Sequence, residues 1–347
     1  MTGGYRAPGW LRGGHAQTIW PALLAPRPAV RLRRERWASP DGDFVDLDWA
    51  DGTGPPAPGG RPLLALFHGL EGSSDSHYAR VLTAHAAARG WDAVVIHFRG
   101  CSGEANRLPR AYHSGDSDEA DWILRRLAAA RGPAPLAAAG VSLGGNVLLK
   151  WLGERGADAR LVAAAAAVSP PQDLHAGAIA LSRGFNRVYT AHFLRTLRRK
   201  SLAMLERHPG LFDRAAVAAS RDFFDFDGLV TAPLHGFASA VDYWTRSSCR
   251  PFLGGVEVPT LVVNALNDPF LPASALARPD EVSRAVRLEY PAEGGHVGFL
   301  VGPPPGRLDW LPRRLFAHFD ETIGTERAPV VAPRADALAT GGSDADR

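Results

Sequence analysis

The chain has 347 residues, of which 46% are hydrophobic, and a formal net charge of +3. This length is enough for one large domain with a buried core, or for two modest ones. The arginines are spread along the chain, apart from small clusters at residues 31–36 and 195–200, whereas a nucleic-acid-binding protein usually gathers its positive charge on one face. We therefore expect no nucleic-acid partner, and we interpret the two clusters as solvated side chains on a strand and on a helix.

Two cysteines, Cys101 and Cys249, are too few and too far apart for a disulfide framework or a metal motif. No apolar run approaches the roughly 20 residues that a membrane-spanning helix needs. Residues 1–12 carry glycine, proline and arginine in place of the apolar core of a secretory signal. The sequence thus predicts no cofactor or metal, no stable membrane insertion and a cytoplasmic location.

Short apolar runs, typical of strands, alternate with longer patterns typical of helices along most of the chain. The residues Pro40-Asp41-Gly42 are typical of a turn, which predicts that the first two strands form an antiparallel hairpin. The remaining alternation predicts an α/β fold with an eight-stranded, mostly parallel sheet and helices on both faces. Strands are predicted at residues 31–37, 44–49, 63–67, 93–98, 135–140, 161–168, 260–265 and 286–290. Helices are predicted at residues 78–89, 116–130 and 146–153, the second with Ser114 as its N-cap.

Residues 170–250 interrupt this alternation, because they contain no convincing strand and are rich in aromatic side chains. One crossover helix needs only about a dozen residues, so the length favours a helical cap insertion over ordinary crossover helices that pack on the sheet. The polar residues 328–347 are predicted to form a disordered tail, which leaves residues 1–327 as a single domain.

The hexapeptide Gly140-Val141-Ser142-Leu143-Gly144-Gly145 fits the pattern G-x-S-x-G between a predicted strand and a predicted helix. A serine in this context sits on a sharp turn that projects its hydroxyl above the sheet, and the flanking glycines leave room for that turn. The motif therefore predicts Ser142 as a nucleophile. The alternatives are a glycine turn without chemistry, and a phosphate-binding loop that fits less well because Ser142 stands where that motif needs a glycine.

The backbone N–H groups that would bind an oxyanion are also predicted from position. His68-Gly69-Leu70 directly follows the predicted strand 63–67. In a fold with such a nucleophile turn, this loop supplies one N–H and the residue after the nucleophile supplies the other, which nominates Leu70 and Leu143. We expect the side chain of His68 to be structural and to take no part in proton transfer.

An acid and a base follow the last two predicted strands, namely Asp268 after 260–265 and His296 after 286–290. The chain order Ser142, Asp268, His296 is that of α/β-hydrolases, in which the imidazole takes the serine proton and the carboxylate orients the imidazole. Asp173 is a rival acid, because it follows the predicted strand 161–168, but it could equally begin a cap helix. We favour Asp268.

With these motifs in place, the sequence resembles the YheT-like family of α/β-hydrolases over nearly its whole length, except the tail. The resemblance implies an α/β-hydrolase fold and a carboxylic-ester hydrolase with the triad named above. It further implies a soluble, cytoplasmic enzyme for short- or medium-chain acyl esters. A small departure is Asn267, where an acid often stands in the family. The matching stretches are residues 14–18, 67–73, 98–103, 112–116, 140–146, 231–237, 267–269 and 294–299.

Ester hydrolysis through an acyl-enzyme is therefore the first functional hypothesis, with a small-molecule acyl ester as the partner and the aromatic insertion as the acyl-binding wall. Acyl transfer to an alcohol would use the same acyl-enzyme. Amide cleavage stays open as well, because a triad does not dictate the leaving group. A non-catalytic binding protein on the same scaffold would usually lose a triad member, and dehalogenase chemistry would need an aspartate in place of Ser142.

Overall fold

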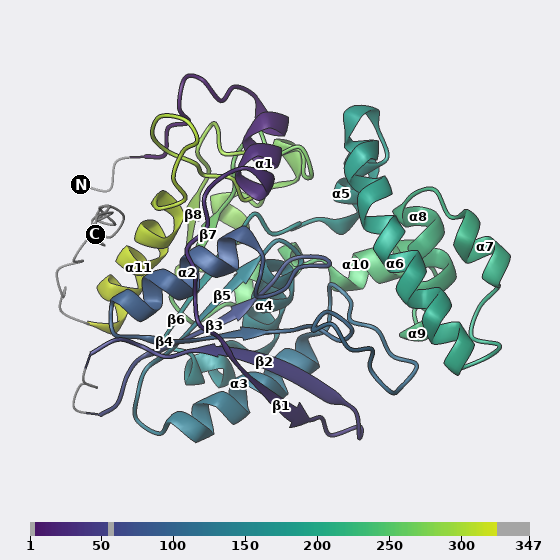
Figure 1. Cartoon of the computed structure of the whole chain (residues 1–347), viewed down its shortest axis with the longest axis horizontal. Coiled ribbons are helices and arrows are strands. Elements are labelled where there is room, and N and C mark those ends of the chain that lie inside the picture. The colour runs from purple at the N-terminus through teal and green to yellow at the C-terminus, as the bar shows by residue number, and fades with distance from the viewer. Residues whose placement is uncertain (1–3, 55–58, 325–347) are drawn as a thin grey trace, which may run out of the picture.

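The computed structural model describes residues 4–54 and 59–324, so the predicted tail at 328–347 lies outside the described residues. Its centre is one eight-stranded sheet in the order β1-β2-β4-β3-β5-β6-β7-β8 (Figure 1). Only the β1–β2 and β2–β4 pairs are antiparallel, which confirms the predicted hairpin and the mostly parallel sheet. The strands are β1 (Arg33–Ala38), β2 (Phe44–Ala50), β3 (Leu63–Phe67), β4 (Asp92–Ile96), β5 (Leu136–Val141), β6 (Ala164–Val168), β7 (Thr260–Val263) and β8 (Val286–Glu289).

Helices cover both faces of the sheet, as predicted. One face packs against α2 (His77–Ala88) and α11 (Trp310–Ile323), and the other packs against α3 (Ser117–Arg131) and α4 (Leu143–Arg155). Every residue of β3, β5, β6 and β7 is consequently buried. This burial explains why these strands appear in the sequence as continuous apolar runs instead of alternating ones.

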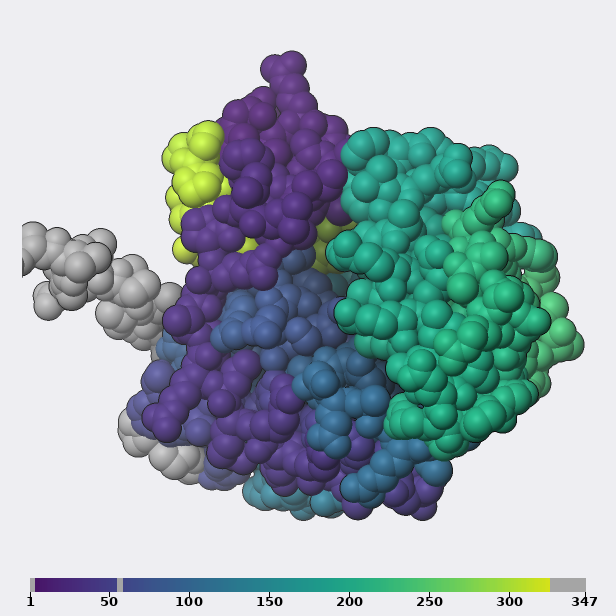
Figure 2. All heavy atoms as spheres, turned by 45° about the vertical axis from the view of Figure 1, so that its right-hand side comes forward, coloured from purple at the N-terminus to yellow at the C-terminus, as the bar shows by residue number. Residues whose placement is uncertain are grey.

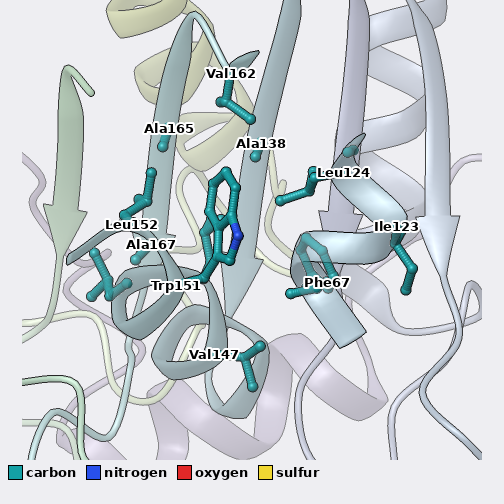
Figure 3. Packing of buried hydrophobic residues seen from close by; sticks show 14 of the residues in the cluster. Phe67, Ile123, Leu124, Ala138, Val147, Trp151, Leu152, Val162, Ala165 and Ala167 are labelled. Atoms are coloured by element: carbon teal, nitrogen blue, oxygen red, sulfur yellow. The ribbon is translucent and has the colours of Figure 1, made fainter. Parts of the chain in front are cut away.

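Trp151 of α4 shows how the sheet accommodates a helix at close range. Its ring is fully buried against the small side chains of Ala138, Ala165 and Ala167 on β5 and β6 (Figure 3). The indole N–H donates to the Asp121 carboxylate at 2.9 Å, so its polar atom is satisfied. The small alanine side chains thereby let α4, the helix that directly follows Ser142, pack close to the sheet.

Three predicted features differ from the structure. The strand predicted at 161–168 is shorter, because a 3₁₀ turn occupies Gly156–Leu161 and β6 begins only at Ala164. Ser114 is not the N-cap of α3, since that helix begins at Ser117, beyond the reach of the Ser114 hydroxyl. The helix predicted at 146–153 begins earlier, at Leu143.

A further helix, α1 (Gly14–Leu23), was not predicted. Figure 1 shows it at the edge of the sheet that carries β7 and β8. Among the helices of residues 4–54 and 59–324, none has both the length and the apolar character needed to span a bilayer.

Between β6 and β7 the chain forms only helices, which lie together to one side of the sheet (Figure 1). We call α5 to α10 the cap helices. They have a small apolar cluster of their own, built around Leu194, Val217, Phe226 and Val230. They are α5 (Leu174–Leu181), α6 (Arg187–Arg207), α7 (Arg214–Ala219), α8 (Phe223–Phe226), α9 (Ala232–Leu234) and α10 (Ala240–Ser247), with a π-helical turn at Asp227–Thr231.

Candidate active site

Ser142 lies on a strained turn between β5 and α4. Its φ of 52° is in the left-handed region that side chains rarely adopt, so the turn must be held by close packing around it. A Cβ on Gly140 would stand 2.4 Å from the carbonyl oxygen of Gly144, and a Cβ on Gly144 would stand 2.5 Å from that of Phe67. Both glycines are therefore required by space, as the motif predicted.

The side chains of Ser142, His296 and Asp268 come together from the loops after β5, β8 and β7. The Ser142 hydroxyl lies 2.9 Å from His296 Nε2, and His296 Nδ1 lies 2.8 Å from Asp268 Oδ2. The second Asp268 oxygen accepts the N–H of Phe270 at 2.8 Å, which holds the carboxylate in place. In this chain of bonds Nδ1 carries the imidazole proton, and Nε2 is left to accept the serine proton.

The rival acid, Asp173, has a different partner. Its carboxylate accepts the N–H of Ala176 at 3.0 Å and so caps the first turn of α5. Of the two interpretations that the sequence allowed, the helix start is confirmed.

Leu70 and Leu143 line the same cavity as Ser142. On either side of Leu70 the amides are occupied, because Gly69 and Glu71 donate to two tyrosine hydroxyls at 2.8 and 2.9 Å. In the part of the chain that the structure describes, the amides of Leu70 and Leu143 have no acceptor. They are thus available to a ligand atom beside the Ser142 hydroxyl.

His68 fixes the orientation of the Leu70 amide. Its Nε2 accepts the N–H of Phe98 at 3.1 Å, so the proton resides on Nδ1, which donates to the Gly69 carbonyl at 2.7 Å. That carbonyl belongs to the same peptide unit as the Leu70 N–H and also accepts from Gly72 at 2.9 Å. Burial lowers the pKa of His68 to about 3, which keeps the ring neutral. The expected structural role of His68 is confirmed.

Sequence reasoning missed the support that α1 gives to the acid and base loops. Gln17 Oε1 accepts both the side-chain amide of Asn267 at 2.8 Å and the N–H of Gly294 at 2.9 Å. The hydroxyl of Thr18 accepts the N–H of His296 at 2.9 Å. One helix therefore ties together the residues that flank Asp268 and His296.

The signal for this support was the stretch 14–18, which entered the family resemblance without a role. The contacts explain its residue types. A Cβ on Gly14 would stand 2.0 Å from the Asn267 carbonyl oxygen, and a Cβ on Gly298 would stand 1.9 Å from that of Gln17. Asn267, which departs from the family pattern, also accepts the N–H of Gly295 at 2.9 Å.

A cavity of about 490 Å³ lies between the sheet and the cap helices, with Ser142 and His296 in its wall. Within the described residues, no group of three or more His, Cys, Asp or Glu side chains is arranged to hold a metal ion. The cap supplies a mostly apolar part of the lining, including Leu174, Leu181, Phe193, Phe223, Phe226 and Val230. Loops of the core and the second half of α6 supply a polar part, including Glu71, Arg99, Asn106, Arg110, Lys200 and Arg207.

Comparison with known proteins finds relatives that match most of this chain. The chain is 41% identical to the putative esterase YheT of Escherichia coli, over 87% of this chain and 88% of that protein. It is 29% identical to human phospholipase ABHD3, over 90% and 78% of the two chains, and 26% identical to the monoacylglycerol lipase of Saccharomyces cerevisiae, over 77% and 59%.

Solved structures share the fold at low sequence identity. The esterase Est1E of Butyrivibrio proteoclasticus, solved with ferulic acid, aligns with a TM-score of 0.54 and 13% identity, over 84% of this chain and all of the other. The family described as alpha/beta hydrolase fold matches residues 62–303. The chain therefore belongs to the α/β-hydrolases, and within them to the YheT-like family.

Proposed function

We propose that the protein hydrolyses carboxylic esters, with Ser142 as nucleophile, His296 as general base and Asp268 as the residue that orients the base. The observation that carries this proposal is the unbroken pair of hydrogen bonds, 2.9 Å from Ser142 to His296 and 2.8 Å from His296 to Asp268. Relatives named as an esterase, a phospholipase and a monoacylglycerol lipase support the same reaction class.

The reaction proceeds in two halves. His296 Nε2 removes the hydroxyl proton of Ser142 as the oxygen bonds to the acyl carbon, and the negative charge on the carbonyl oxygen is stabilised by the amides of Leu70 and Leu143. His296 then gives the proton to the departing alcohol, which leaves an acyl-enzyme. In the second half the same imidazole activates a water molecule, which releases the acid and restores Ser142.

The substrates we propose are esters with short or medium acyl chains. The cavity of about 490 Å³ is within the range of small-molecule sites, roughly 300–1,000 Å³. Its apolar part comes from the cap helices, so we propose that residues 170–250 act as the cap that holds the acyl chain.

The direct test is hydrolysis of p-nitrophenyl esters from acetate to palmitate by the wild type and by Ser142→Ala. We expect a maximum at short or medium chains and a loss of several orders of magnitude in the variant, whose circular dichroism should match the wild type. Wild-type rates in Ser142→Ala would refute the assignment. Product analysis with an added alcohol separates hydrolysis from acyl transfer.

The chain offers a matched test of the acid. Asp268→Asn should lower kcat by roughly 10⁴-fold, because the amide favours the wrong imidazole tautomer. Asp173→Asn should keep near-wild-type kcat, because asparagine caps a helix about as well as aspartate. The reverse result would show that Asp173 is the acid.

A further inference from the structure

The segment from α5 into α6 has an unusual charge. Residues 174–205 contain no aspartate or glutamate, but six basic side chains: Arg183, Arg187, Arg195, Arg198, Arg199 and Lys200. Lys200 pairs with Glu71 at 2.8 Å, and Arg198 donates to backbone carbonyls. The other four guanidinium groups have no side-chain partner among the residues that the structure describes, so their charge is uncompensated.

The exposed residues in the first half of α6 lie on one face of the helix. At 3.6 residues per turn, those from Arg187 to Arg195 fall within about 140° of arc. The opposite side of α6 carries Leu194, which is buried in the cap, and Phe193 and Leu197, which line the cavity. The outer face is formed by Arg187, Val188, Ala191, His192 and Arg195, whereas Arg199 already contributes to the cavity lining.

Apolar side chains are exposed at the same place. Ile179, Phe185 and Val188 are 40%, 51% and 56% exposed, and all three lie at the junction of α5 and α6. Single exposed apolar residues are common on soluble proteins, but three within ten residues, among uncompensated arginines, form an amphipathic surface. The junction is held firmly, because the Asn186 side chain donates to the Ala180 carbonyl at 3.0 Å.

This surface adjoins the candidate active site. The Tyr189 ring contacts Phe270 at 4.8 Å, and Phe270 stacks on His296 at 4.0 Å. Phe185 contacts His15 of α1 at 4.7 Å, and Figures 1 and 2 both show α1 and α5 at the same end of the molecule. A partner bound to the outer face of α6 would therefore lie close to the cavity.

We propose that the outer face of α6 and the α5–α6 junction form a docking surface for an anionic lipid bilayer. Arginines would lie against the phosphates of the headgroups, while Phe185, Val188 and Ile179 enter the boundary with the acyl chains. A nucleic acid would pair with the arginines but would leave the aliphatic side chains of Ile179 and Val188 without a partner. The stretch from Arg187 to Arg195 lying flat offers roughly 13 Å of contact, to which the α5–α6 junction adds. Docking at this face would bring the cavity to a surface where apolar esters collect.

The test is flotation of the full chain with vesicles of phosphatidylcholine alone, or of three parts phosphatidylcholine to one part phosphatidylglycerol. We expect the wild type to float only with the anionic vesicles, and less at high salt. The double variant Arg187→Gln/Arg195→Gln should bind about 30-fold more weakly, because each arginine near an anionic surface contributes ~1 kcal/mol. Phe185→Ser should also weaken binding, but without changing its salt dependence.

The matched control is Arg160→Gln/Arg313→Gln, which removes the same charge from exposed positions of the sheet domain and should bind like the wild type. Equal losses in the two double variants, or no flotation of the wild type, would overturn the proposal. Binding to duplex DNA without binding to vesicles would overturn it as well. Hydrolysis of p-nitrophenyl acetate in the same variants should be unchanged, so a failure of the esterase proposal can be told apart from a failure of this one.

Discussion

Asp227 is a buried carboxyl group that the proposed reaction does not use. It lies in the π-helical turn of the cap, where it accepts from the Thr231 hydroxyl at 2.6 Å and from the Trp244 indole N–H at 2.8 Å. Burial raises the pKa of Asp227 to about 6. Since this pKa is above that of an aspartate in an unfolded chain, about 3.9, the folded state binds the proton more tightly. Asp227 therefore lowers the stability of the fold increasingly as the pH rises from about 4 through 6.

Asp227→Asn should remove this pH-dependent cost. The asparagine oxygen can accept from Trp244 and its NH₂ group can donate to the Thr231 hydroxyl, so both partners stay satisfied. We expect the free energy of unfolding at pH 8 to rise by about 1–3 kcal/mol over the wild type, and the gain to shrink towards pH 4. Denaturant unfolding across this pH range measures the difference, with the exposed Glu206→Gln as control. A gain that stays constant with pH would mean that the carboxyl titrates normally.

The sequence was most informative about residues whose role depends on their own neighbours in the chain. Ser142 could be located because the strand, the turn and the two glycines are contiguous, and Asp268 and His296 because each follows a strand. Gln17 could not be assigned a role, since its partners Asn267 and Gly294 lie about 250 residues or more away in the chain. A glutamine has no chemical signature that would single out such a contact.

Among the elements, α1 is the one whose function emerges only from the structure. Gln17 is almost fully buried and is the shared acceptor of two amides from different loops. Gln17→Leu would leave both donors unpaired and would loosen the loops that carry Asp268 and His296. We expect kcat to fall by roughly 10- to 100-fold with little change in KM, because a misplaced base affects the transition state more than substrate binding.

Ester hydrolysis kinetics, together with a thermal melt of each variant, would check this role of α1. Leu23→Gln, an exposed change on the same helix, is the matched control and should leave kcat unchanged. Should Gln17→Leu keep wild-type kcat, or change kcat and KM equally, α1 would be a structural helix without influence on the base.

The elements that the sequence predicted well are those with a strong hydrophobic period. All eight strands were located within a few residues. The central strands β3, β5, β6 and β7 are buried on both faces and therefore appear as uninterrupted apolar runs. The largely exposed β1 was located through the turn that joins it to β2. The helix α1 was missed because it is short and contains Pro21, which is a helix breaker in most interior positions. The N-cap prediction for α3 was wrong for a related reason: Ser114 and Asp116 are both good N-cap residues, so the local sequence does not decide between them.

At the scale of the whole molecule, the apolar core is divided. Two large clusters pack on the two faces of the sheet, whereas the cap helices keep the separate cluster around Leu194 and Phe226. The sequence predicted a helical insertion at 170–250 from its length and its lack of strands. It could not predict how the six helices pack there, because all but α6 have only about one or two turns of pattern and their arrangement is set by contacts between them.

A divided core predicts that the cap can lose its order without unfolding of the sheet. Leu194 and Leu148 are both fully buried, but the first lies in the cap cluster and the second in the cluster between α4 and the sheet. Either leucine-to-alanine change should cost roughly 2–5 kcal/mol locally. Leu194→Ala should speed amide hydrogen exchange in α6 to α8 and leave β3 to β7 protected, while Leu148→Ala should speed exchange throughout the molecule, because it lowers the stability of the unit on which all elements depend. If Leu194→Ala instead speeds exchange in the central strands as much as in α6, the cap and the sheet unfold as one cooperative unit, and the separate cluster has no thermodynamic independence.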